Sequence, residues 1–205
     1  MSKAESIFVG LIIGPVLPIV LFLVGWWTSL SFVTDRTVFL FGLIGLGIGC
    51  IVDIVFLRRW IAKAYWWNIK VLALVYIFYS VCVFGFFMGV PIFNLAVGIV
   101  AGVFMGRRFY YLSTPKERLH NGVNKVSFFA ALTMGLISVA SAYFATKDLR
   151  DTALNLRGMF NLPFLPTDQM IIVLIVVGGT GLVLTQYWIT KRLTRLAYRI
   201  GNHVS

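Results

Sequence analysis

The sequence predicts an all-α integral membrane protein with six transmembrane helices. Of its 205 residues, 60% are hydrophobic and only 12% are charged, and the mean hydropathy is +0.91. This charged fraction is about half of the globular average, too little to cover a water-soluble surface. The lysines and arginines lie between apolar runs or in the tails, as the bilayer requires. We therefore expect lipid to be the main solvent of this chain.

Six apolar runs, at about residues 7–30, 38–57, 71–90, 91–106, 126–146 and 169–190, are the expected spans. Most of them approach the ~20 helical residues that cross about 30 Å of hydrocarbon. The connections are short except for one larger outer loop at 147–168. We expect a single polytopic membrane domain over 1–205, with a basic amphipathic tail at 190–205.

The distribution of cations predicts the orientation. With the N-terminus inside, the inner segments hold 14 of the 18 lysines and arginines, and the outer ones hold Arg36, Lys147, Arg150 and Arg157. Inner loops of membrane proteins carry such an excess. We expect both termini to be cytoplasmic, in the inner or plasma membrane of a cell.

The first run contains Pro15 and Pro18, which predict a bent or partly unwound helix. In transporters, such a break exposes backbone carbonyls to an ion or substrate. Proline is also common in membrane helices, which favours a packing kink as the interpretation.

The second run places Gly42, Gly45, Gly49 and Asp53 on one helical face, within an arc of about 80°. A glycine face lets another helix approach closely. Asp53 is the only acid within a span, and we expect it to point into protein. Two roles are open for it: a proton- or cation-responsive group, or a polar partner of another helix.

The third and fourth runs are separated only by the turn Gly89-Val90-Pro91. We expect a tight hairpin of two short spans, with a re-entrant pair as the alternative. Tyr76 and Tyr79 share a face and are candidates for a polar track, or for hydrogen bonds within the bundle.

The fourth run carries Gly98, Gly102 and Gly106 at i, i+4 spacing, with Asn94 on the same side. This doubled GxxxG pattern predicts a packing face. The second and fourth runs point in the same direction, so we expect that their glycine faces can pack together.

Cations beside the spans are expected to bind anionic headgroups of the inner leaflet or a cytoplasmic partner. These residues are Arg58, Arg59, Arg107, Arg108, Lys191, Arg192, Arg195 and Arg199. The aromatic residues among them indicate an interfacial belt rather than a nucleic-acid site. Thr114-Pro115-Lys116-Glu117 predicts a capped interfacial helix that ends near Gly122. The segment 147–168 is apolar enough to lie on the outer leaflet or to cover the helix ends.

Catalytic motifs are absent from the sequence, which has no HExxH, nucleophile elbow, P-loop, CxxC or paired-carboxylate site. We expect no enzyme, no cofactor and no metal site. The leading hypothesis is a transport-related protein, either channel- or transporter-like or the membrane subunit of a transport complex. The alternative is an assembly subunit that binds other membrane helices, or a second copy of itself, through its glycine faces. An enzyme acting on a lipid phosphate is a remote third possibility.

Six spans in about 200 residues, with both ends inside, also resemble in topology the substrate-capturing subunits of energy-coupling-factor transporters. No substrate motif of that family is present in the sequence.

Overall fold

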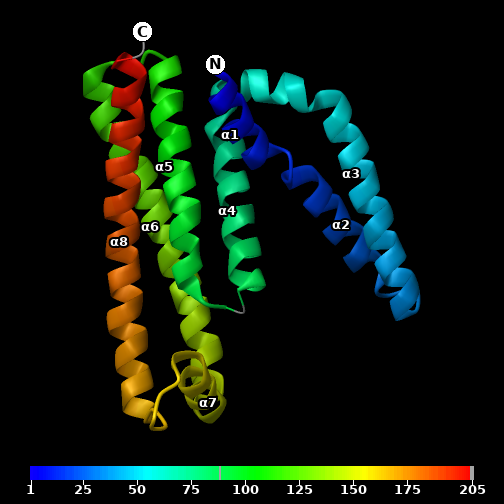
Figure 1. Cartoon of the computed structure of the whole chain (residues 1–205), viewed down its shortest axis with the longest axis vertical. Helices are drawn as coiled ribbons and strands as arrows, with labels where there is room; N and C mark the ends of the chain where they lie inside the picture. Colours follow the sequence, from blue (N-terminus) through cyan, green and yellow to red (C-terminus); the bar gives the residue numbers. More distant parts are fainter. Residues whose placement is uncertain (88, 204–205) are drawn as a thin grey trace. The chain divides into compact units, whose positions relative to one another are not determined.

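The computed structural model describes residues 1–87 and 89–203, with the side chains of residues 35, 36, 202 and 203 left out (Figure 1). These residues form helices and no strands. The helices are α1 (Lys3–Ile13), α2 (Val16–Ser29), α3 (Asp35–Lys63), α4 (Ile69–Phe86), α5 (Asn94–Tyr111), α6 (Lys116–Lys147), α7 (Leu149–Phe160) and α8 (Asp168–His203). Two short 3-10 helices, Ala64–Trp66 and Pro91–Phe93, follow α3 and precede α5.

Six helical segments are long and apolar enough to cross a membrane. Helices α1 and α2 together make the first, and α3, α4, α5, α6 and α8 supply the others. The all-helical class and the six apolar helices are therefore confirmed. The predicted tail is helical as far as His203, and its last two residues lie outside the described part of the chain.

The chain divides into two compact units, one ending at Asn68 and one beginning at Ile69. In unit 1, α2 packs antiparallel to α3 along most of its length (Figure 1). Its first span is interrupted as expected, since α1 ends at Ile13 and α2 begins at Val16. Pro15 has no N–H and its ring crowds the preceding turn, so the regular helix stops there.

In unit 2, α5 and α8 lie side by side and run in the same direction, and α6 packs along α8 (Figure 1). The contacts have a constant register. A Cβ added at Gly98 would meet Gln186, one at Gly102 would meet Thr190, and one at Gly106 would meet Thr194. The residue numbers differ by 88 in all three pairs, so the two helices keep step over two turns of i, i+4 spacing.

The α4–α5 hairpin is shorter than its neighbours. Helix α4 has 18 residues, whereas α6 has 32 and α8 has 36. In the α5–α8 register, Pro91 at the hairpin turn lies level with Gly179. The first 11 of the 36 residues of α8, which precede Gly179, therefore extend beyond the hairpin, as Figure 1 shows.

One predicted boundary was wrong. The helix that starts after Pro115 does not end near Gly122 but continues as α6 to Lys147. A glycine inside a helix costs only about 1 kcal/mol, and the packing of Gly122 against the Phe109 ring favours continuity. The predicted capping box does not form either, because Pro115 occupies the N-cap and makes no side-chain cap bond.

The segment 147–168 contains the helix α7, which we did not predict. The Asp148 carboxylate accepts a hydrogen bond from the Asp151 N–H at its start, and Asn161 ends it with left-handed backbone at φ 49°. Aspartate at the N-cap and asparagine after the last turn are sequence signals for such boundaries. Helix α7 contacts α6 and α8 at one end of unit 2.

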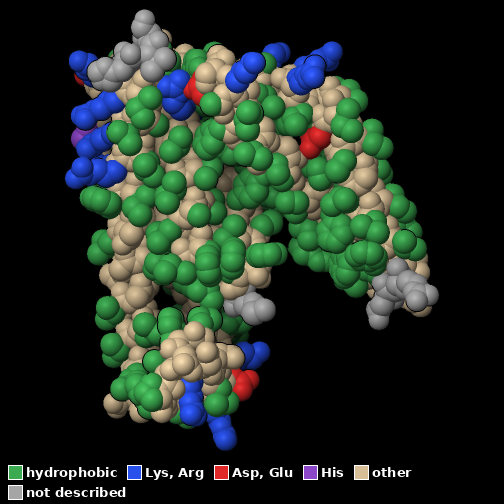
Figure 2. Space-filling model, viewed as in Figure 1, with side chains coloured by type: hydrophobic (Ala, Val, Ile, Leu, Met, Phe, Trp, Pro, Cys, Tyr) green, Lys and Arg blue, Asp and Glu red, His purple; other side chains and the backbone are tan. Residues whose placement is uncertain are grey.

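Large apolar side chains cover the outward faces of the helices in each unit (Figure 2). Ile54 on α3 is 82% exposed and Phe86 on α4 is 81% exposed. Water-soluble monomers rarely expose continuous apolar surface of this kind. It is the surface expected of helices whose outer faces contact acyl chains.

Candidate functional site

The glycine face of α3 is covered by α2 from within unit 1. A Cβ at Gly45 would collide with the Leu21 carbonyl oxygen, and one at Gly49 would lie 2.5 Å from the Pro18 Cα. A Cβ at Gly42 would meet the Phe22 ring at 2.9 Å. The absence of side chains at these positions is what allows the two backbones to approach so closely.

Asp53 continues this face toward the interrupted first span. Gly49, one turn before it, lies against Pro18, and Leu57, one turn after it, lies 3.6 Å from the Cβ position of Gly14. Asp53 therefore faces the segment from Gly14 to Pro18. Its side chain is only 8% exposed, and its Oδ1 atom has no hydrogen-bond partner.

The interrupted segment offers groups that a regular helix does not. Pro15 and Pro18 have no N–H, so the carbonyls of Leu11 and Gly14 lack the donors that i+4 residues normally supply. The last turn of α1 directs the negative end of its dipole toward this level and the first turn of α2 directs the positive end, so the two helix ends largely offset each other. Carboxylate and carbonyl oxygens together can hold a proton or a small cation, as broken helices do in transporters.

Unit 2 has a separate, uncharged polar cluster between α4, α5 and α8. The Gln186 Nε2 atom donates to the Tyr76 hydroxyl and to the Thr190 Oγ1 atom, each at 3.4 Å. The Thr190 hydroxyl in turn donates to the Gly98 carbonyl at 3.4 Å. The Tyr76 ring also packs on Phe129 of α6, with centroids 5.6 Å apart.

Asn94 lies one helical turn before Gly98 and is 3% exposed. Neither its Nδ2 nor its Oδ1 atom has a hydrogen-bond partner, and the Gln186 Oε1 atom also lacks one. Buried amides without partners are costly, more so in a lipid environment. The cluster therefore has unused capacity to bind water or a small polar solute.

The structure thus separates the predicted polar residues. Tyr76 and Asn94 belong to α4 and α5 of unit 2, whereas Asp53 belongs to unit 1. Tyr79 is half-buried on α4 and packs edge-on against Phe78 at 5.6 Å.

Gln186, Thr190 and Thr194 were not among our predicted residues, although all three are fully buried on α8. Their i, i+4 spacing places all three on one face of α8, and this spacing in an otherwise apolar run could have predicted a polar stripe. The Thr194 hydroxyl donates to the Thr190 carbonyl at 2.7 Å, which satisfies it within the helix. The stripe covers the glycine face of α5, so each predicted glycine face is occupied by a helix of its own unit.

The predicted headgroup-binding cations lie near the ends of the spans. Arg58 and Arg59 are exposed on α3. On α8, the Lys191 Nζ atom lies 5.0 Å from the centre of the Tyr187 ring, and the Arg192 guanidinium lies 5.1 Å from that of Trp188. Arg107, half-buried on α5, lies over Tyr110 at 5.0 Å. Arg108, also on α5, is half-buried. On α8, Arg195 is half-buried and Arg199 is exposed.

No family model, no curated protein and no solved structure matches this chain. Among the described residues, no group of three or more histidines, cysteines, aspartates or glutamates is placed to hold a metal ion.

Proposed function

We propose that this protein moves a small cation or proton across a membrane, with Asp53 as the ion-responsive group. The observation that carries this proposal is the buried carboxylate of Asp53, with an unpartnered oxygen, opposite a proline-interrupted helix. Acids inside membrane spans are costly and mark ion pathways. The oxygen donors around the break suit a hard cation or a hydronium ion.

The proposed orientation has both termini in the cytoplasm of a cell bounded by this inner or plasma membrane. It is supported by the gathering of cations at the end of unit 2 where α5 and α8 finish and α6 begins (Figure 2). Arg107, Arg108, Lys116, Arg118 and Arg195 belong to that end. Such cations favour the anionic leaflet and are retained on the inner side.

The assembly alternative was based on glycine faces that bind other membrane helices or a second copy. Because α2 and α8 cover these faces, they give that alternative no support. The lipid-phosphate enzyme likewise gains no support from a metal cluster among the described residues. Transport remains the function that the geometry favours, either by the chain alone or within a complex.

The proposal is tested by replacing Asp53 with asparagine, which keeps the size and removes the charge. Purified protein in liposomes is assayed for proton flux with entrapped pyranine, for ²²Na⁺ uptake and for ⁸⁶Rb⁺ uptake. We expect the wild type to move at least one of these ions, and Asp53→Asn to lower that flux at least tenfold.

The matched control is Asp168→Asn, which removes an exposed acid from the first turn of α8. We expect this variant to retain wild-type flux. Both variants must elute as the wild type does in size-exclusion chromatography. Full flux through Asp53→Asn, or no flux of any of the three ions in the wild type, would overturn the proposal.

A further inference from the structure

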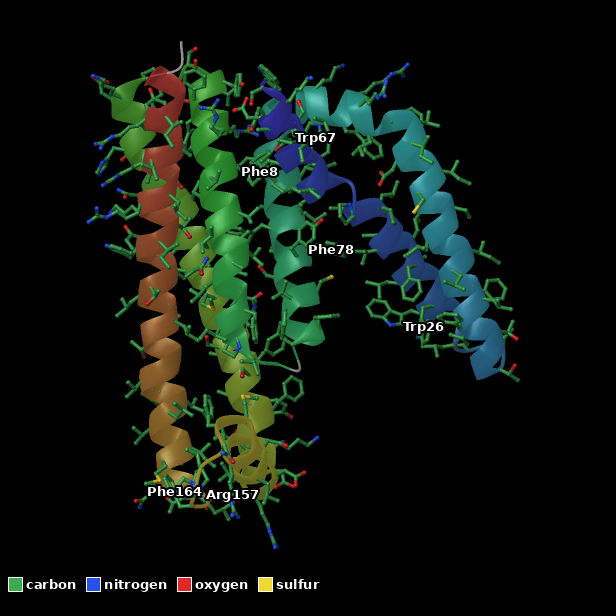
Figure 3. All side chains as sticks on the ribbon, viewed as in Figure 1. Phe8, Trp26, Trp67, Phe78, Arg157 and Phe164 are labelled. Carbon is green, nitrogen blue, oxygen red and sulfur yellow. The ribbon has the colours of Figure 1, made fainter. Side chains whose placement is uncertain are left out.

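Unit 2 contains a cavity of about 810 Å³ between the α4–α5 turn and α7. Its walls come from α6 and α8, and α7 closes the end. Arg157 lies in the last turn of α7 and Phe164 in the segment that follows it. Figure 3 places both residues at this end of the unit. The volume lies in the range of about 300–1,000 Å³ that is typical of small-molecule sites.

The cavity exists because the hairpin is short. Pro91 at the turn lies level with Gly179, and α8 begins 11 residues earlier, at Asp168. That part of α8 is about 16 Å long at 1.5 Å per residue. Neither α4 nor α5 lies beside it, so α6 and α8 enclose a space that the hairpin does not fill.

Glycines keep this space open. A Cβ added at Gly178 of α8 or at Gly85 of α4 would meet no atom within 4 Å, and both residues line the cavity. A Cβ at Gly179 would meet only the Ser138 Cβ, at 3.7 Å. At these three positions, α4 and α8 therefore add no side chain to the cavity.

The lining is apolar, with a few polar groups. The apolar lining residues include Phe84, Leu156, Phe160, Ile171, Leu174 and Leu182, and Ser138, Ser141, Thr152 and Asn155 supply hydroxyl and amide groups. The Ser138 Oγ atom is buried and has no hydrogen-bond partner. Apolar walls with a few polar groups bind molecules that have an apolar body and a polar end.

The cavity opens sideways onto the apolar surface of the helices. Leu174 is 52% exposed and Phe160 is 62% exposed, although both line the cavity. Molecules therefore enter from the layer that surrounds these helices, which is the bilayer. The length of about 16 Å is close to half of the ~30 Å hydrocarbon thickness, the depth of one leaflet.

We propose that this cavity binds one acyl chain of a bilayer lipid from the leaflet next to α7. The chain runs between α6 and α8 from α7 to the hairpin turn, with its ester end near Thr152 and Asn155. Helix α7, with an apolar face over the cavity and Arg150 and Arg157 exposed, lies at headgroup depth as amphipathic interfacial helices do. This inference does not depend on Asp53 or on ion movement.

The test uses the full chain in liposomes that contain phosphatidylcholine with a diazirine in the middle of one acyl chain. After illumination and proteolysis, we expect lipid adducts concentrated on peptides covering 138–145 and 171–182. Adducts on α3 measure the general labelling by surrounding lipid and serve as the internal standard.

Gly178→Phe fills the cavity from α8, and we expect it to lower the labelling of these peptides at least fivefold relative to α3. Gly85→Phe fills it from α4 and should give the same loss, which keeps the test valid if one variant fails to fold. Gly181→Phe is the matched control. Its Cβ also meets no atom within 4 Å, but Gly181 does not line the cavity, so labelling should be unchanged.

Equal labelling of all lipid-facing peptides would overturn the inference, and so would unchanged labelling in both filled variants. Absence of lipid adducts from these peptides while α3 is labelled would also overturn it.

Discussion

Gly45 and Gly47 are two residues apart on α3, and their surroundings are opposite. A Cβ at Gly45 would collide with the Leu21 carbonyl oxygen of α2, whereas one at Gly47 would meet no atom within 4 Å. A flexible side chain can move away from an added methyl group, but a backbone carbonyl in a packed helix cannot do so without shifting the helix. The same substitution should therefore have opposite effects at the two positions.

We expect Gly45→Ala to destabilise unit 1 by about 1–3 kcal/mol, the usual cost of overpacking. Gly47→Ala should be neutral or stabilising by up to about 1 kcal/mol, because alanine is the better helix former. Thermal unfolding of the purified variants in one detergent, side by side with the wild type, measures both. Equal midpoints for the two variants would contradict the packing described for α2 and α3.

Residue patterns predicted the shared face of Gly42, Gly45, Gly49 and Asp53, because helical periodicity alone determines which residues share a face. They did not predict which helix covers that face. Parallel direction suggested the second and fourth runs as partners, but α2 and α8 occupy those positions. Any apolar helix could pack on a glycine face. Which helix does so depends on the fit of its side chains, which helical periodicity does not describe.

Among the helices, the positions of the prolines and the lengths of the apolar runs predicted the interruption of the first span and the number of long apolar helices well. The interruption between α1 and α2 follows directly from the missing N–H groups of Pro15 and Pro18. The apolar content of 147–168 does not by itself predict helix α7, whose start is signalled by Asp148 as an N-cap. The predicted break between an interfacial helix and the fifth span at Gly122 was wrong, because a single glycine does not interrupt α6.

Joining α1 and α2 tests the role of the interruption. Pro15→Ala with Pro18→Ala restores the N–H donors to the carbonyls of Leu11 and Gly14. The double variant should also be more stable, because a proline inside a helix costs about 3 kcal/mol. We expect the double variant to unfold at a higher temperature and to lose at least tenfold of the ion flux in the liposome assay.

The control for this pair is Pro115→Ala at the N-cap of α6, outside both helices. It should leave the flux at the wild-type level. A double variant that is more stable and still transports at the normal rate would show that the interruption serves packing alone.

At the scale of the whole molecule, composition and charge predicted the class, and they did not predict the division of the helices into two units. That division depends on which helices contact one another, which the net charge and hydropathy of single runs do not encode. The cavity under α7 was equally hidden, because it arises from the unequal lengths of α4 and α8 in a shared register.

The orientation is tested with single cysteines in a background of Cys50→Ser and Cys82→Ser. A membrane-impermeant maleimide should label Arg157→Cys on α7 in intact cells. It should label Ser2→Cys and Ser113→Cys only after the membrane is permeabilised. The reverse pattern would place both termini outside.

The parallel pairing of α5 with α8 has a consequence for biosynthesis. Tyr111 ends α5, and α8 is complete only at His203, 92 residues later. At about 5–20 residues per second, the ribosome needs roughly 5–20 s to make that stretch. Until then, the Gly98–Gly106 face and the amide of Asn94 have no partner helix, and they remain open to whatever the insertion machinery or the bilayer supplies. The nascent chain thus passes through a stage in which its most polar membrane helix is held without its final neighbour.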